Sequence, residues 1–404
     1  MAAPLKTSAG AFVPRAVFEV SSQIKRSYFL GHHAAALSSM RKILSNIGLI
    51  LECRDSRLPL TSANPLLESS LAGRDRIIVY TKSDLCVPAN SMPLIKEQQH
   101  LLTRWDTSRT QTGDGVGGGK TEVVFTNMRN PRSITRLLDA IKRRAAAQDS
   151  LVGLRALVVG MPNAGKSSLL NALRHVGMQL PKAAQTGAQP GITRKLSMPV
   201  RIVAASPSPS PSSPTSSDIS NSNSNSIPKL ASPNYEQDVG EGVFVVDTPG
   251  VFVPYVSDVE SMLKLSLVGC VKAGIVPSET VADYLLFQLN LRDPSLYADL
   301  CGTPTNDIGE FLDAVAQRTG KLVKGGGPAR EQAADWILQR WRRGDLACFG
   351  LDDVTEKGLE ERARRAREQG ENSPLSMNQA RKREKETRKA KNAAKRAAAL
   401  DSGA

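Results

Sequence analysis

The sequence of 404 residues predicts an α/β fold with a doubly wound, mostly parallel sheet, followed by an all-helical segment. Short runs rich in β-branched residues alternate with helical stretches up to about residue 255, which is typical of a sheet with helices on both faces. The runs are GLILEC, RIIVYT, EVVFT, RALVVG, MPVRIV and GVFVVD. From Val256 onward, apolar residues recur at three- and four-residue spacing, which predicts a helical domain over residues 256–350.

The composition indicates a polyanionic partner. The net charge is +14 and the isoelectric point is about 9.7, so we expect binding to nucleic acid or to an anionic membrane surface. No apolar run reaches the roughly 18 residues that a membrane-spanning helix needs. The five cysteines are scattered without a Cys-x-x-Cys pair, which favours reduced thiols over a zinc site.

Three segments depart from the globular pattern. Residues 1–25 are basic and rich in small or hydroxylated residues, which predicts a mitochondrial targeting segment. An insertion at about residues 204–238 contains a Ser, Pro and Asn tract that we expect to be disordered. Residues 351–404 form a basic tail, also expected to be disordered, whose residues 380–400 hold nine Lys or Arg against two Glu.

The stretch VVGMPNAGKSSLLNAL, residues 158–173, predicts a phosphate-binding loop. Gly160 is followed after four residues by Gly165-Lys166-Ser167, directly behind an apolar strand and before a helix, as this motif requires. Backbone N–H groups would hold the phosphates, Lys166 would neutralise their oxygens, and the Ser167 hydroxyl would bind Mg²⁺. We assign nucleotide binding here to Asn163, Ala164, Gly165, Lys166, Ser167 and Ser168. A second glycine-rich stretch, GGGKT, precedes a strand instead of a helix, and we assign it no nucleotide role.

Two further motifs complete a predicted magnesium and γ-phosphate site. VVDTPGV places Asp247 at the end of a strand, where it would hold Mg²⁺ through water, and Gly250 where its N–H reaches the γ-phosphate. TGAQPGITR supplies Thr193, whose hydroxyl would complete the magnesium shell when a switch loop closes.

The guanine-reading motif is expected after Asp247, but no Asn/Thr-Lys-x-Asp follows it. An upstream strand ends in Thr81, Lys82, Ser83 and Asp84, and the Asp84 carboxylate is able to accept the N1 and N2 protons of guanine. A later strand ends in FTN, where a backbone amide near Thr126 and Asn127 would contact the guanine carbonyl. A surface turn is the alternative for TKSD. The complete motif set favours a circularly permuted domain.

In this permuted order, the motifs FLGHHAAAL, ECRDSRLPLTSANP, TKSD, FTN, GMPNAGKSSLLNAL, GAQPGITR and DTPGVFVP resemble the circularly permuted GTPases of the YlqF/RbgA type, most closely their mitochondrial ribosome-associated branch. The resemblance implies a P-loop GTPase domain over residues 26–255 that hydrolyses GTP to GDP and phosphate. It also implies a factor for assembly of the large ribosomal subunit, in the mitochondrial matrix and peripheral to the inner membrane. Thr81 departs from the family's usual Asn, and the Ser-rich insertion is peculiar to this chain.

The catalytic group is the least defined part of the site. The position after Asp-x-x-Gly holds Val251, which is unable to orient water. The family resemblance implies a histidine of the GH motif instead, which is His32, and Asn163 resembles the asparagine that binds K⁺ in cation-dependent GTPases. Two alternatives remain: a regulatory GTPase on an anionic membrane surface, and a nucleotide-silent RNA-binding assembly factor. Nothing in the sequence predicts an obligate homo-oligomer.

Overall fold

The computed structural model describes residues 12–20, 24, 31–87, 91–111, 119–148, 153–187, 191–193, 196–205, 241–253, 255–256, 258–369, 382 and 384–389. Nearly all of the predicted insertion, and the predicted tail beyond residue 369 except 382 and 384–389, lie outside the described residues.

Within the described residues, one six-stranded sheet runs in the order β3-β2-β1-β4-β6-β5. Neighbouring strands are parallel except β5 and β6, which are antiparallel. All six predicted runs form strands, and the predicted α/β fold class is confirmed. The strands are β1 (Leu49–Asp55), β2 (Arg76–Thr81), β3 (Thr121–Phe125), β4 (Leu154–Gly160), β5 (Val200–Val203) and β6 (Val243–Asp247).

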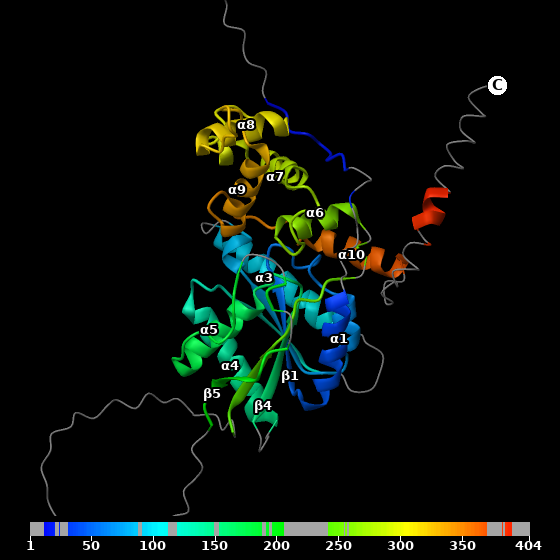
Figure 1. Cartoon of the computed structure of the whole chain (residues 1–404). Helices are drawn as coiled ribbons and strands as arrows, with labels where there is room; N and C mark the ends of the chain where they lie inside the picture. Colours follow the sequence, from blue (N-terminus) through cyan, green and yellow to red (C-terminus); the bar gives the residue numbers. More distant parts are fainter. Residues whose placement is uncertain are drawn as a thin grey trace, which may run out of the picture.

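Helices cover both faces of the sheet (Figure 1). In β1, Leu49 and Leu51 share a core with α4 and α5, whereas Ile50 shares one with α1 and α2. This alternation follows from the two-residue period of a strand. The helices around the sheet are α1 (Gly31–Ile43), α2 (Pro65–Ser70), α3 (Met92–Gln111), α4 (Pro131–Gln148) and α5 (Lys166–Met178), with short 3-10 turns η1 (Leu44–Asn46) and η2 (Ser83–Leu85).

The strand order brings motifs that are distant in sequence to one edge. β1 lies between β2 and β4, and its last residues pair with Thr81 on one side and Gly160 on the other. The chain proceeds from β1 to β3 in one direction and from β4 to β6 in the other, so the order reverses between β1 and β4. Ligands of doubly wound sheets bind at such a reversal, beyond the carboxyl ends of the strands.

The residues after β6 form a helical layer above this edge (Figure 1). Its core of apolar side chains continues into the sheet domain through Met161 and Phe252. Asp258 and Asp307 cap two of the helices by accepting hydrogen bonds from backbone N–H groups. The elements are α6 (Val259–Leu267), α7 (Ser278–Arg292), η3 (Pro294–Tyr297), α8 (Ile308–Thr319), α9 (Arg330–Arg343) and α10 (Glu356–Gln369).

Two packed segments extend beyond the predicted domain limits. Within the predicted targeting segment, Phe18 packs edge-on against Tyr284 with ring centroids 5.3 Å apart, and Arg15 pairs with Asp283. Within the predicted tail, α10 buries Leu359 in a core with side chains of α3. A disordered tail starting at residue 351 is therefore wrong for residues 351–369, because this segment forms α10 and buries the side chains of Leu351, Val354 and Leu359. Among the described residues, none of the helices combines the length and apolar character needed to cross a membrane.

Candidate nucleotide-binding site

The phosphate loop joins β4 to α5 through two glycines with positive φ. Gly160 has φ +141°, and a Cβ atom there would lie 2.3 Å from the carbonyl oxygen of Cys53. Gly165 has φ +87° and precedes the first turn of α5. Only glycine adopts these conformations at little cost. The loop backbone is therefore held against the end of β1, with α5 starting directly behind it.

Lys166 folds back over the loop. Its Nζ donates to the carbonyl oxygens of Gly160 at 3.2 Å and Met161 at 2.7 Å. Burial lowers the pKa of Lys166, although the nearby Asp247 carboxylate opposes the shift. A phosphate anion in the loop would offset the cost of burying this ammonium group, since an opposite charge favours the charged form.

Three oxygen-bearing side chains from three segments converge beside the loop. The Ser167 hydroxyl donates to Oδ2 of Asp247 at 2.6 Å and lies 3.2 Å from Oγ1 of Thr193. Oδ1 of Asp247 is buried and has no hydrogen-bond partner within the described part of the chain. Burial raises the pKa of Asp247, against the effect of the Ser167 hydrogen bond. Hard oxygen donors with one unsatisfied buried carboxylate oxygen fit Mg²⁺.

The segment after Asp247 packs tightly on the phosphate loop. A Cβ atom at Gly250 would lie 2.5 Å from Cα of Pro162. Val251 is fully buried, and its backbone N–H donates to the carbonyl oxygen of Gly160 at 3.2 Å. A side chain at position 251 therefore points into the core, away from any attacking water.

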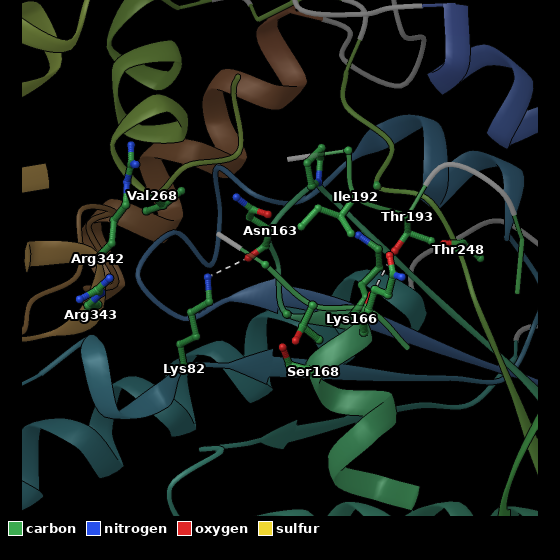
Figure 2. Close-up of a pocket in the computed structure, with 18 of the residues that line it drawn as sticks. Lys82, Asn163, Lys166, Ser168, Ile192, Thr193, Thr248, Val268, Arg342 and Arg343 are labelled. Atoms are coloured by element: carbon green, nitrogen blue, oxygen red, sulfur yellow. Dashed lines mark hydrogen bonds between the residues drawn. The ribbon is translucent and has the colours of Figure 1, made fainter. Parts of the chain in front are cut away.

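The upstream motif is attached directly to the phosphate loop. The Thr81 hydroxyl donates to the carbonyl oxygen of Ala164 at 2.7 Å. Lys82 has φ +56°, and its Nζ donates to the carbonyl oxygen of Asn163 at 2.8 Å (Figure 2) and to Asp55 at 2.7 Å. The permuted fold thus brings the predicted guanine reader beside the predicted phosphate loop.

The other residues predicted to contact guanine lie at the ends of β2 and β3. Asp84 lies in η2, and its carboxylate is 3.8 Å from Nε of Arg129. The backbone N–H of Ser83 donates to the carbonyl oxygen of Thr126 at 3.1 Å, which ties the two strand ends together.

The predicted amide contact to guanine from Thr126 or Asn127 does not match the hydrogen bonds observed. The Thr126 amide donates to the carbonyl oxygen of Tyr80 at 2.7 Å, and the Asn127 amide donates to Oγ of Ser133 at 2.9 Å. Both amides are engaged within the protein, because the end of β3 continues its ladder with β2 and then turns into α4.

A cavity of about 270 Å³ lies over the phosphate loop. In Figure 2, Arg342 and Arg343 of α9 lie on one side of it and Thr193 lies on the other. Eight predicted residues line it: Lys82, Asn163, Gly165, Lys166, Ser167, Ser168, Thr193 and Gly250. The other seven predicted residues are not in its lining: Thr81, Ser83, Asp84, Thr126, Asn127, Ala164 and Asp247. His32 lies in the first turn of α1, and its side chain is outside the described atoms.

The sequence did not identify a buried ion pair under this cavity. The Arg57 guanidinium binds both oxygens of Asp55, at 3.0 and 2.8 Å, and its Cζ lies 4.8 Å from the centre of the Trp341 ring. Burial disfavours the charged carboxylate, but Arg57 and Lys82 outweigh it and hold the pKa of Asp55 well below its usual range. The sequence feature that could have indicated this ion pair is an Asp-x-Arg at the end of an apolar strand.

The helical layer contributes one wall of the cavity, which the sequence also did not indicate. Arg342 donates to the carbonyl oxygens of Ser266 and Leu267 at 2.9 and 2.8 Å, and so joins the end of α9 to the end of α6. Asn163 of the phosphate loop donates through Nδ2 to the carbonyl oxygen of Gly269, just beyond α6, at 2.7 Å. The loop and the helical layer therefore share a hydrogen-bonded boundary.

Residues 155–296 match a family described as 50S ribosome-binding GTPase. The chain is 33% identical over 349 residues to mitochondrial GTPase 1 of Schizosaccharomyces japonicus, which covers 83% of this chain and 93% of that protein. It is 28% identical over 356 residues to mitochondrial ribosome-associated GTPase 1 of Xenopus tropicalis, covering 84% and 98%. The solved structure of GNP-bound YlqF from T. maritima aligns with a TM-score of 0.44 at 18% identity, covering 79% of this chain and 98% of that one.

Proposed function

The chain belongs to the mitochondrial GTPase 1 family, and from this premise we propose that it binds an immature large subunit of the mitochondrial ribosome, with GTP hydrolysis controlling its release. The protein is a GTPase, with GTP as substrate. The observation that carries the proposal is the match, over most of both chains, to a Xenopus protein named for its association with the mitochondrial ribosome. The net charge of +14 supports an RNA-containing partner.

GTPase folds typically use Mg²⁺, and we assign its ligands to Ser167, Thr193 and, through water, Asp247. The ion supplies charge neutralisation at the phosphates when bound. We assign to Lys166, whose Nζ lies against the carbonyl oxygens of Gly160 and Met161, the neutralisation of the β and γ oxygens of GTP.

Water activation requires a group other than residue 251. We assign it to His32 in the first turn of α1, and we assign a K⁺ contact to the amide oxygen of Asn163. The amide nitrogen of Asn163 donates to Gly269, which orients the side chain at the edge of the cavity. Because a single hydrogen-bond donor is able to supply the roughly 2.7 kcal/mol that a 100-fold stimulation needs, one histidine ordered by the ribosome is sufficient.

Single-turnover GTP hydrolysis, with and without purified large subunits, tests this catalytic assignment. We expect slow basal turnover, near the roughly 10⁻⁴ s⁻¹ of unstimulated small GTPases, and stimulation by the subunits. His32→Ala should lose most of the stimulation and keep GTP affinity and the basal rate. His100→Ala, an exposed histidine of α3, is the matched control. Equal stimulation in wild type and His32→Ala removes His32 from the reaction.

The location of the protein follows from the same proposal. We place it in the mitochondrial matrix, peripheral to the inner membrane, with residues 1–25 containing the targeting signal and the basic tail adding RNA affinity. Tagged protein purified from gently lysed mitochondria should carry large-subunit ribosomal RNA. Deleting residues 380–404 should lower RNA affinity equally for all sequences and flatten its salt dependence. If the deletion releases the protein from membranes and leaves ribosome binding intact, the membrane-surface GTPase is the better account.

A further inference from the structure

A second, larger cavity lies on the helical layer. It has a volume of about 660 Å³ and is lined largely by the outer side of α9. Its lining includes one tryptophan, three cations and two amides, namely Trp336, Lys321, Arg340, Arg343, Gln332 and Gln339. None of the motifs assigned to the nucleotide site accounts for it.

Trp336 is the aromatic centre of this cavity. One part of its ring packs against the helical core, and the side chain is only half-buried. Nζ of Lys321 lies 5.9 Å from the ring centre, and Cζ of Arg340, one helical turn further along α9, lies 5.1 Å from it. A partly exposed ring accompanied by cations is the combination on which proteins stack the bases of single-stranded nucleic acids, because the ring meets the base and the cations meet the phosphates.

The charge balance of the cavity favours an anionic ligand. Two carboxylates, Asp335 and Asp345, line it against three cations. Asp335 accepts a hydrogen bond from the Ser278 hydroxyl at 2.6 Å, and Arg340 donates through Nε to the backbone carbonyl oxygen of Asp345 at 3.3 Å. The Asp335 carboxylate is thus partly occupied by a structural contact, and the three cations outnumber the two acids.

We propose that this cavity binds an unpaired base of a single-stranded RNA segment, stacked on Trp336, with Lys321, Arg340 and Arg343 contacting the adjoining phosphates. The inference rests on the proposed function, which makes ribosomal RNA the partner. The amides of Gln332 and Gln339 offer donors and acceptors to a base edge. Gln339 and Arg343 also line the nucleotide cavity, so the bound RNA would lie next to the GTP site.

The test is the affinity of the full-length, GDP-loaded protein for a short fluorescein-labelled oligouridylate. Trp336→Ala should weaken binding by about 5- to 150-fold, the range that corresponds to loss of one base–aromatic stack. Trp336→Phe should retain most of the affinity. Trp105→Ala is the matched control: Trp105 also has an arginine near its ring, Arg109 at 5.4 Å, but it does not line this cavity. Lys321→Gln should reduce the salt slope by about 0.7.

A photocrosslink on the wild-type protein keeps the test independent of whether a variant folds. Irradiating the complex should attach uridine to the tryptic peptide that contains Trp336. Crosslinks confined to the basic tail would overturn the inference, as would equal affinity of Trp336→Ala and wild type, or equal losses for Trp336→Ala and Trp336→Phe. Binding of fluorescein-labelled polyglutamate together with failure to bind the oligouridylate would identify an acidic protein partner and overturn the inference as well.

The inference and the proposed function fail in different ways. If the wild-type protein binds large subunits but crosslinks no RNA at Trp336, the inference is wrong and the proposed function stands. If it crosslinks RNA at Trp336 but captures no large-subunit RNA from mitochondria, the ribosomal function is wrong and the RNA site stands.

Discussion

The Thr81 hydroxyl donates a 2.7 Å hydrogen bond to the carbonyl oxygen of Ala164, although the two residues are 83 positions apart. Both groups are buried, Thr81 at the end of β2 and Ala164 in the phosphate loop. The bond joins the proposed guanine-reading motif to the proposed phosphate loop, so the two parts of the candidate site are held at a fixed separation.

Thr81→Val should therefore lower both stability and GTP affinity. The methyl group leaves the Ala164 carbonyl without its donor in a buried position, which costs about 1–3 kcal/mol. Chemical denaturation and GTP titration measure the two effects. Thr81→Ser keeps the hydroxyl and serves as control, and it should retain most of the stability and affinity. Losses in Thr81→Ser as large as those in Thr81→Val would contradict the role assigned to the hydrogen bond.

Asp84→Asn should exchange base specificity. Its carboxylate accepts two guanine N–H donors in the proposed mode, and each hydrogen bond to a charged group is worth about 1.5–3 kcal/mol. GTP affinity should fall roughly 100-fold or more, and xanthosine triphosphate should bind better than it does to wild type. Titrations of wild type and Asp84→Asn with GTP and with xanthosine triphosphate measure these affinities. Undiminished GTP affinity would remove the upstream motif from the guanine site.

Ser167→Ala should remove the Mg²⁺-dependent part of GTP binding. Its hydroxyl lies within 2.6 Å of the Asp247 carboxylate, where the proposed ion would bind. Affinity for GTP should fall by roughly tenfold or more with Mg²⁺ present, about 1.4 kcal/mol, and adding a chelator should then change little. Ser69→Ala on the exposed surface of α2 is the control. A variant that still depends fully on Mg²⁺ would contradict the assignment.

Asp55→Asn should destabilise the fold by about 3–5 kcal/mol, because it leaves the Arg57 guanidinium buried without its counter-charge. Since the folded-state pKa of Asp55 is depressed, the advantage of wild type is full above the ordinary aspartate pKa and is lost as pH falls through the depressed value.

Urea unfolding across the acid range measures this difference. Glu356→Gln, which breaks the exposed pair with Arg104, should cost under about 1 kcal/mol. Similar costs for the two substitutions would mean that burial does not strengthen the Asp55 pair.

Replacing K⁺ by Na⁺ should slow GTP turnover if the Asn163 amide oxygen binds a potassium ion in place of an arginine finger. Asn163→Ala should abolish the difference between the two salts, which hydrolysis assays at matched ionic strength will show. Equal rates of the wild-type protein in both salts would leave Asn163 with its hydrogen bond to Gly269 as its structural role.

Part of this candidate site could be predicted from local sequence patterns. The glycine spacing around Lys166 and the strands that flank it depend on neighbours in sequence, and the structure has β4, the loop and α5 where the pattern predicts them. The permuted order is itself a property of the sequence, and it predicted Thr81–Asp84 as the guanine-reading motif. The same reasoning rejected GGGKT, and β3 does begin at Thr121 directly after its lysine.

By itself, then, the sequence determined the α/β fold, the motif set and the permutation, because strand patterns and loop spacings are local. Only the tertiary structure decided that Arg57 pairs with Asp55 beneath the cavity, that the Thr126 and Asn127 amides are already engaged, and that α9 forms one wall of the site. Arg57 and Arg342 are 285 positions apart, yet they are joined by a 3.4 Å hydrogen bond. Such contacts depend on which surfaces pack together and exclude water, and a charged residue has the same local pattern whether it is solvated or buried against a partner.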